Sequence, residues 1–242
     1  SSPWNIEQKM DILHQGMALL TALMSGDERA KAEFHATMMI RRNPAINTTS
    51  GVALTPTVSG TALHSVINKN RLSELISLVA ALSVTSVSLE TLLVFMDMLF
   101  DAPILKSRSI ISQFQLDENS ISDGLFANKY DRPKICNIYA VPIIFGLLPH
   151  CSVVLQKCIL VSFHSLVSGR ASLINISTCS QMQPSLLDLI LDIFPLVVDS
   201  VQMCAVRALQ CLGKHSVHVA QLKRMFRMMQ SKGDTRPSST WR

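Results

Sequence analysis

The chain of 242 residues is 48% apolar, 16% charged and only 5% aromatic. This composition excludes an intrinsically disordered protein, because it supplies enough apolar surface for a core, which must be mainly aliphatic. The net charge is +5, but the segment 214–242 carries seven basic residues and one acidic residue, so the rest of the chain sums to −1. A basic charge confined to one end is not the broad footprint of a nucleic-acid-binding domain, so no nucleic-acid partner is expected.

Residues 1–40 are predicted to form an N-terminal helix pair. Apolar residues recur at helical spacing over 4–24, which predicts the first helix. Ser25 lies three residues before Glu28, a capping-box pattern that predicts a second helix through about Met39.

Loops and helices alternate in the middle of the chain. Residues 41–62 are rich in Thr, Ser, Pro and Gly and are predicted to form a flexible linker. Residues 70–100 are predicted to form two helices with a break near 83–86, and 101–136 is predicted to be a long loop. The longest apolar run, 75–89, has roughly 15 residues where about 20 are needed to cross a bilayer, so no transmembrane helix is predicted.

From Asn137 onward the helical signal is strong, and start and stop signals delimit consecutive helices. No segment shows the alternation typical of a strand, so we expect an all-α fold. Residues 232–242 are predicted to form a disordered tail. The predicted caps are Ser152, Ser185, either Asp199 or Ser200, and Ser216, and the predicted helix ends are at Gly169, Gly213 and Gly233.

The helices also resemble one another at fixed offsets in the sequence. A period of roughly 40 to 47 residues is typical of HEAT and armadillo repeats. We therefore expect residues 63–231 to form an armadillo/HEAT-like helical-repeat stack, an α-solenoid fragment interrupted by the loop at 101–136. The matches at offset 46 are Leu148-Pro149 with Phe194-Pro195, Leu155 with Val201, Cys158 with Cys204 and Leu166 with Leu212, and those at offset 66 include Leu82 with Leu148 and Val87 with Val153.

The six cysteines form no C-x-x-C pair. Cys151 and Cys158 lie seven residues apart, as do Cys204 and Cys211, which is the spacing of core residues on one helix face and not of a disulfide framework. This usage favours a reducing, cytoplasmic compartment.

One group of residues suggests a metal site. Cys211, His215 and His218 lie at i, i+4 and i+7, and zinc accepts such ligands. Gly213 and Ser216 break the helix between them, however, and no fourth ligand is evident. We therefore predict no metal and no cofactor.

Catalytic motifs are missing as well. The chain contains no nucleotide-binding, nucleophile-elbow or metalloprotease motif. Asp188 and Asp192 are a carboxylate pair at i, i+4 on one predicted helix, and we interpret them as a solvated face. His150 and His164 have no defined nucleophile and orienting group around them. We therefore expect a protein that is not an enzyme, and no catalytic residue is assigned.

The segment 213–233 predicts a final amphipathic helix whose apolar stripe packs inward. The other face carries Lys223, Arg224 and Arg227, which we predict to contact a protein partner or an anionic lipid surface. A solvated face without a partner is the simpler alternative. The predicted stripe consists of Val219, Leu222, Met225, Phe226 and Met229.

Three stretches resemble the helical region of the very large BEACH-domain proteins, the neurobeachin-like and Alfy-like group. They are LPHCSVVLQKCILVSFHSLVSGRASL, LLDLILDIF and ALQCLGKHSVHVAQLKRMFRMMQS, and the resemblance is best over 141–231 and weaker over 4–40. In that family such a region precedes a concanavalin A-like domain.

The resemblance implies a cytoplasmic, non-catalytic scaffold segment of a larger polypeptide that also carries BEACH and WD-repeat domains. Such scaffolds bind protein partners in vesicle trafficking, autophagy or lysosome-related organelles. Two other functions stay open. One is a peripheral membrane or phosphoinositide-binding module that uses the basic C-terminal helix, and the other is a karyopherin- or adaptor-like cargo binder.

Overall fold

The structure, a computed structural model, contains ten α-helices and no strand within the residues that it describes, so the predicted all-α fold is confirmed. The predicted linker at 41–62 and the predicted caps and ends at Ser216 and Gly169 lie outside these residues, as does most of the predicted loop at 101–136. The predicted tail begins too early, because the last helix includes residues 232 and 233. The described residues are 5–39, 71–83, 86–101, 133–168, 172–215 and 217–233.

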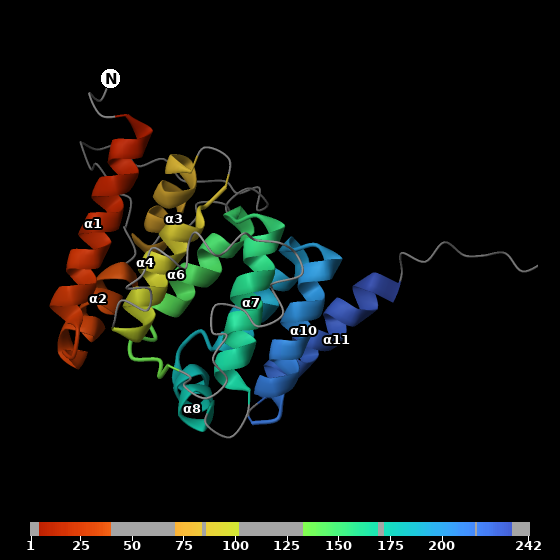
Figure 1. Cartoon of the computed structure of the whole chain (residues 1–242). Helices are drawn as coiled ribbons and strands as arrows, with labels where there is room; N and C mark the ends of the chain where they lie inside the picture. Colours follow the sequence, from red (N-terminus) through yellow and green to blue (C-terminus); the bar gives the residue numbers. More distant parts are fainter. Residues whose placement is uncertain are drawn as a thin grey trace, which may run out of the picture.

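The helices follow the predicted order along the chain (Figure 1). Their bounds confirm the predicted break near 83–86 and the predicted helix ends at Gly213 and Gly233. The N-terminal helices are α1 (Ile6–Met24), α2 (Glu28–Met39), α3 (Arg71–Leu82) and α4 (Leu89–Phe100). The C-terminal helices are α6 (Ala140–Leu147), α7 (Val153–Val167), α8 (Leu173–Gln181), α9 (Leu186–Ile193), α10 (Asp199–Gly213) and α11 (Val219–Gly233), with short 3-10 helices η3 (Leu148–His150) and η5 (Phe194–Leu196).

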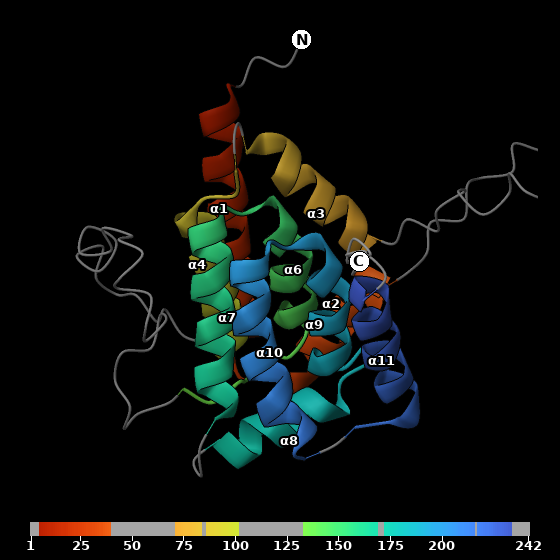
Figure 2. The same cartoon turned by 90° about the vertical axis from the view of Figure 1, so that its right-hand side faces the viewer.

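Most of the principal contacts join helices that are not consecutive in the chain. The helices α2, α3, α6, α9 and α11 each pack on the next, while α1 packs on α4 and α7 packs on α10. Figure 2 shows α4 and α7 at one side of the molecule and α3, α9 and α11 at the other. The shared core is aliphatic, as the composition predicts, and its central aromatic contact is an edge-to-face pair of Phe145 and Phe163 with centroids 5.0 Å apart.

Two helix–turn–helix units have the same architecture. The first unit is α6, η3 and α7, the second is α9, η5 and α10, and every element boundary differs by 46 residues. A side-chain contact recurs at the same offset: Gln156 Nε2 donates to the Cys151 carbonyl and Gln202 Nε2 to the Val197 carbonyl, each at 3.0 Å. The glutamine in each unit satisfies a carbonyl of the turn, which would otherwise lack a partner.

The turn between α3 and α4 contacts the turn of the first unit. The Val87 backbone N–H donates to the His150 carbonyl at 2.9 Å, and Val87 forms a parallel bridge with Cys151. The following helices are capped by Ser88 and Ser152, which are 64 residues apart. The offset between these helices is therefore 64 residues, and the predicted value of 66 is wrong by two.

Local capping is predicted well in two places. Ser152 caps α7 as predicted, and Ser185 caps α9 in a capping box with Asp188. The predicted cap of α10 is wrong, because Val198 stands at the N-cap position and Asp199 is already helical.

The predicted cap of α2 is wrong too. Ser25 is the residue that ends α1, and the Asp27 carboxylate instead accepts from the backbone N–H groups of Arg29 and Ala30. Gly26 between them has a φ of 74°, which favours glycine and allows the tight turn.

A buried lysine joins the N-terminal helices to the chain beyond α4. The Lys31 side chain is 2% exposed, and its Nζ lies 2.5 Å from Asp101 Oδ2 and 2.7 Å from Glu28 Oε1. It also donates to the Cys136 carbonyl at 3.3 Å. Burial by itself lowers the pKa of Lys31, but the hydrogen bonds and charges of Asp101 and Glu28 outweigh it, so the pKa lies above its ordinary value.

The segment after residue 132 is held from its other side by Asn175 on α8. The Asn175 side chain is buried, donates to the Pro133 and Leu166 carbonyls at 3.2 Å and accepts from the Ile135 backbone N–H at 3.0 Å. Because all these polar groups are paired, the segment is fixed between the N-terminal helices and α7.

We predict that Leu155→Asp unfolds the protein. Leu155 is buried in the core, and an unpaired carboxylate there costs several kcal/mol, a large part of the stability of an ordinary domain. Val153→Asp is the matched control, because Val153 is exposed in the first turn of the same helix, where an acidic residue is favourable. Circular dichroism melting of both variants measures this, and equal melting temperatures would reject the core assignment.

We predict that Lys31→Met destabilises the fold by about 3–5 kcal/mol at neutral pH, because Asp101 then lacks its buried cation. The pKa of Lys31 is raised above 10.5, so its contribution is complete below pH 10.5 and is lost as the pH rises through the raised value. The stability difference between wild type and variant should therefore shrink in alkaline denaturation series. Arg29→Met, at an exposed ion pair with Glu33, should change stability by less than about 1 kcal/mol.

Candidate interaction surface

Polar contacts with α9 fix the position of α11. Gln221 is only 6% exposed, and its Nε2 donates to Asp188 Oδ1 at 2.9 Å and to Ser185 Oγ at 3.1 Å. Its Oε1 accepts from the His218 backbone N–H at 3.0 Å, so both ends of the amide are used. One buried amide therefore connects the start of α11 to the start of α9.

The two carboxylates of α9 have partners. The interpretation as a solvated face is wrong for Asp188, which is half-buried, but Asp192 is exposed as predicted. Burial by itself raises the pKa of Asp188, but the hydrogen bonds from Ser185 and Gln221 and the charge of Arg224 outweigh it, so the pKa lies below its ordinary value. Asp192 accepts from Arg224 at 2.5 Å at the surface.

These contacts give α11 a different rotation from the predicted one. Met225 and Met228 pack against the core, but Leu222, Phe226 and Val219 are 42%, 60% and 68% exposed. The prediction that Phe226 packs inward is therefore wrong, because the contacts of Gln221 and Arg224 with α9 turn a different side of the helix inward. The side chain of Met229, the remaining stripe residue, lies outside the described part of the chain.

The three predicted contact residues do not share one open face. Lys223 and Arg227 are exposed, while Arg224 is half-buried and paired with Asp192. The surface of α11 that faces solvent is therefore an apolar strip, made by Val219, Leu222 and Phe226, beside the two exposed cations.

An apolar groove of about 540 Å³ opens between α9, α10 and α11. Polar side chains are few, and Lys214 lies among them. Such size and lining are typical of sites that bury an apolar ligand or a helix face. The lining residues are Leu187, Leu191, Phe194, Val206, Leu209, Gln210, Gly213, Lys214, Val217, Leu222, Met225 and Met228.

The offset of 46 residues shows what the groove corresponds to in the preceding unit. Six of its lining residues have counterparts in the first unit that are at most 1% exposed. There, α9 and α10 pack on α6 and α7. The groove is therefore the side of the second unit whose counterpart in the first unit is largely buried beneath further helices. The counterparts of Leu187, Leu191, Phe194, Val206, Leu209 and Gly213 are Val141, Phe145, Leu148, Leu160, Phe163 and Val167.

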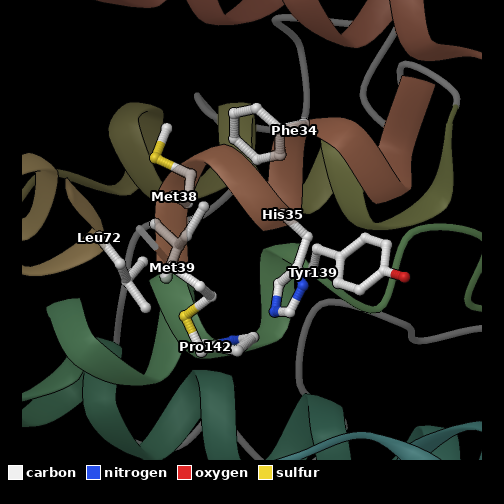
Figure 3. A pocket seen from close by; sticks show the side chains of 8 residues that line it. Phe34, His35, Met38, Met39, Leu72, Tyr139 and Pro142 are labelled. Atoms are coloured by element: carbon white, nitrogen blue, oxygen red, sulfur yellow. The ribbon is translucent and has the colours of Figure 1, made fainter. Parts of the chain in front are cut away.

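A second cavity, between α2, α3 and α6, is too small for a ligand. It measures about 10 Å³, roughly one water molecule. His35 stacks on Tyr139 there with ring centroids 4.2 Å apart, and burial lowers the pKa of His35. Figure 3 shows the Tyr139 hydroxyl directed away from Met38 and Leu72, so no polar group of this ring points into the cavity.

The cysteines and histidines of the described residues do not form a reactive or metal-binding cluster. Burial raises the pKa of Cys151 and Cys179 to about 12 and that of Cys158 to about 11, so these thiols stay protonated. No group of three or more metal-ligating side chains comes together within the described ranges, and this includes Cys211, His215 and His218.

Comparison with protein families, with curated proteins and with solved structures finds no match for this chain. Among the helices in the described ranges, none is both long enough and apolar enough to cross a bilayer.

We predict that Asp188→Asn loosens α11 at neutral pH, at a cost of about 1–2 kcal/mol, because the carboxylate is a partner of both Ser185 and Gln221. The pKa of Asp188 is lowered below 3.8, so its contribution is present above pH 3.8 and is lost as the pH falls through the lowered value. Melting temperatures of wild type and variant should converge in acid. Asp192→Asn, which removes an exposed ion pair, should cost at most about 1 kcal/mol, and an equal effect of both variants would contradict the assignment.

Proposed function

We propose that this chain is a non-catalytic helical scaffold, an armadillo-like stack whose last unit binds a helix of another protein. Support for the stack comes from the identical spacing of the two units and from the recurring glutamine contacts of Gln156 and Gln202. Repeat stacks bury each unit beneath the next and need a polar outer face on the last unit, so an apolar face that stays exposed indicates a partner.

The groove between α9, α10 and α11 is the observation that carries this proposal. Its lining is apolar, and six corresponding residues of the first unit are buried where α9 and α10 pack on α6 and α7. A surface shaped for helices and left open on α10 favours a helical ligand, which binds by an apolar face at i, i+3, i+4 and i+7.

The cellular setting of the proposal comes from the resemblance to BEACH-domain proteins. The resembling residues 141–231 correspond to α6 through α11 and thus contain both units and the groove. On this basis we propose a cytoplasmic scaffold segment of a larger polypeptide in vesicle trafficking, autophagy or lysosome-related organelles.

A second function, binding to anionic membranes, is favoured by one observation. Lys223 and Arg227 are exposed beside the apolar strip that includes Phe226, which is the pattern of a helix that lies on a lipid surface. The pairing of Arg224 with Asp192 reduces the charge offered to lipid, so this function ranks second.

A labelled peptide with the α10 sequence, residues 199–213 with both cysteines changed to alanine, tests the proposed function. In the first unit α10 covers the counterpart of the groove, so the peptide should bind the intact protein with a Kd of roughly 1–100 µM by fluorescence anisotropy. Leu222→Glu should weaken binding at least about tenfold, because it places a charge in the groove. Ala220→Glu, at an exposed position of the same helix turn, should leave it unchanged.

The membrane function is tested by reversing the charges of Lys223 and Arg227. Vesicles containing phosphatidylserine should bind the protein in a salt-dependent way, and Lys223→Glu with Arg227→Glu should abolish that binding, at about 1 kcal/mol for each cation. Vesicle binding without peptide binding would replace the first proposal by the second.

A further inference from the structure

Both ends of the helix series present uncovered apolar faces. At the C-terminal end this is the groove beside α10 and α11. At the N-terminal end, Ile12, Leu19 and Leu23 of α1 are 54%, 62% and 69% exposed and follow the i, i+7, i+11 spacing of one helix face. Gly16 lies in the same row, and nothing comes within 4 Å of the position of a Cβ there.

The two ends also have complementary positions in the order of packing. The helices α2, α3, α6, α9 and α11 pack in series, and α11 is the last described helix of this series. On the other side, α1 packs on α4 and α7 packs on α10. Among the described helices, α1 is therefore the first on this side and α10 is the last. Within the described part of the chain, the outer face of α1 is thus exposed, and the groove beside α10 and α11 has room for one more helix.

We propose that α1 of a second copy of this chain binds in the groove between α10 and α11, so that the copies join head to tail. The inference rests on the proposed function of the groove as a helix-binding site and names its occupant. In this arrangement Ile12, Leu19 and Leu23 of one copy face Val206, Leu209 and Leu222 of the other. The contact joins two different surfaces and therefore leaves one end of each kind open for a further copy.

The charges of the two ends support this occupant. Residues 5–39 carry five acidic and three basic residues, a net charge of −2, while residues 186–233, which form the three groove helices, carry three acidic and six basic residues, a net charge of +3. Opposite charges attract the two different ends to each other and disfavour contacts between two like ends. Glu7 and Asp11 are exposed on α1, and Lys214, Lys223 and Arg227 are exposed around the groove.

Sedimentation velocity of the full chain over a concentration series tests the proposal. The sedimentation coefficient of the wild-type protein should rise with protein concentration, and it should rise less at high salt. Gly16→Arg, which has room in the monomer and favours a helix, and Leu222→Glu should each weaken association at least about tenfold. Ala18→Gln, a neutral change at an exposed position of α1 outside the row of Ile12, Gly16 and Leu19, is the matched control and should associate like wild type.

Mixing the two variants separates this contact from any symmetric one. Gly16→Arg retains an intact groove and Leu222→Glu retains an intact α1, so an equimolar mixture should form 1:1 dimers and nothing larger. Circular dichroism of each variant confirms that it is folded. Charge reversal gives a second check: Lys223→Glu with Arg227→Glu should weaken association, and Glu7→Lys with Asp11→Lys in the partner copy should restore it.

A wild-type protein that stays monomeric at about 100 µM would overturn head-to-tail binding. So would association that both variants leave unchanged, or a mixture of the variants that stays monomeric. Binding of the α10 peptide under the same conditions would then show that the groove accepts a helix from another source, so the proposed function would stand. If the protein neither self-associates nor binds the α10 peptide, the proposed function is rejected as well.

Discussion

The α6–α7 and α9–α10 units carry apolar residues on more than one side, and each side must be covered to stabilise the fold. In the first unit this requirement is met, since Leu160 and Phe163 of α7 are buried by the unit that follows. A buried leucine or phenylalanine contributes about 1.5–3 kcal/mol, so covering such a face stabilises a stack strongly, and leaving it open favours any helix that can fill it. The open groove on the second unit follows from this one constraint.

Polar contacts determine how the ends of the series are arranged. Lys31 joins α2 to Asp101 after α4, and Gln221 joins α11 to the start of α9. Neither contact is a large source of net stability, because burying polar groups has its own cost. Their effect is to select one arrangement: an unpaired Asp101 or Asp188 would disfavour other rotations of the neighbouring helices. The rotation of α11 set in this way exposes Leu222 and Phe226 and so creates one wall of the groove.

Helix order, most boundaries and the offset of 46 residues were predictable from the sequence, because caps, breaks and periodicity are local signals. Ser152, Ser185 and Gly213 act within a few residues of where they stand. The partners of Lys31 at Asp101 and Cys136 are 70 and 105 residues away, and no local pattern marks them. The rotation of α11 was not predictable either, since its apolar residues cover more than one side. A buried Gln221 with two acceptors on α9 was the deciding feature.

Hydrogen exchange of the full chain, followed by mass spectrometry at low and high protein concentration, tests the central claim most directly. We predict that at low concentration peptides from α10 exchange faster than those from α7, because nine of the 15 residues of α7 are buried but only five of the 15 of α10. At high concentration, protection should increase in α1, α10 and α11 and stay constant in α7. Equal exchange of α7 and α10 at low concentration, with no concentration effect in α1 or α10, would contradict the account.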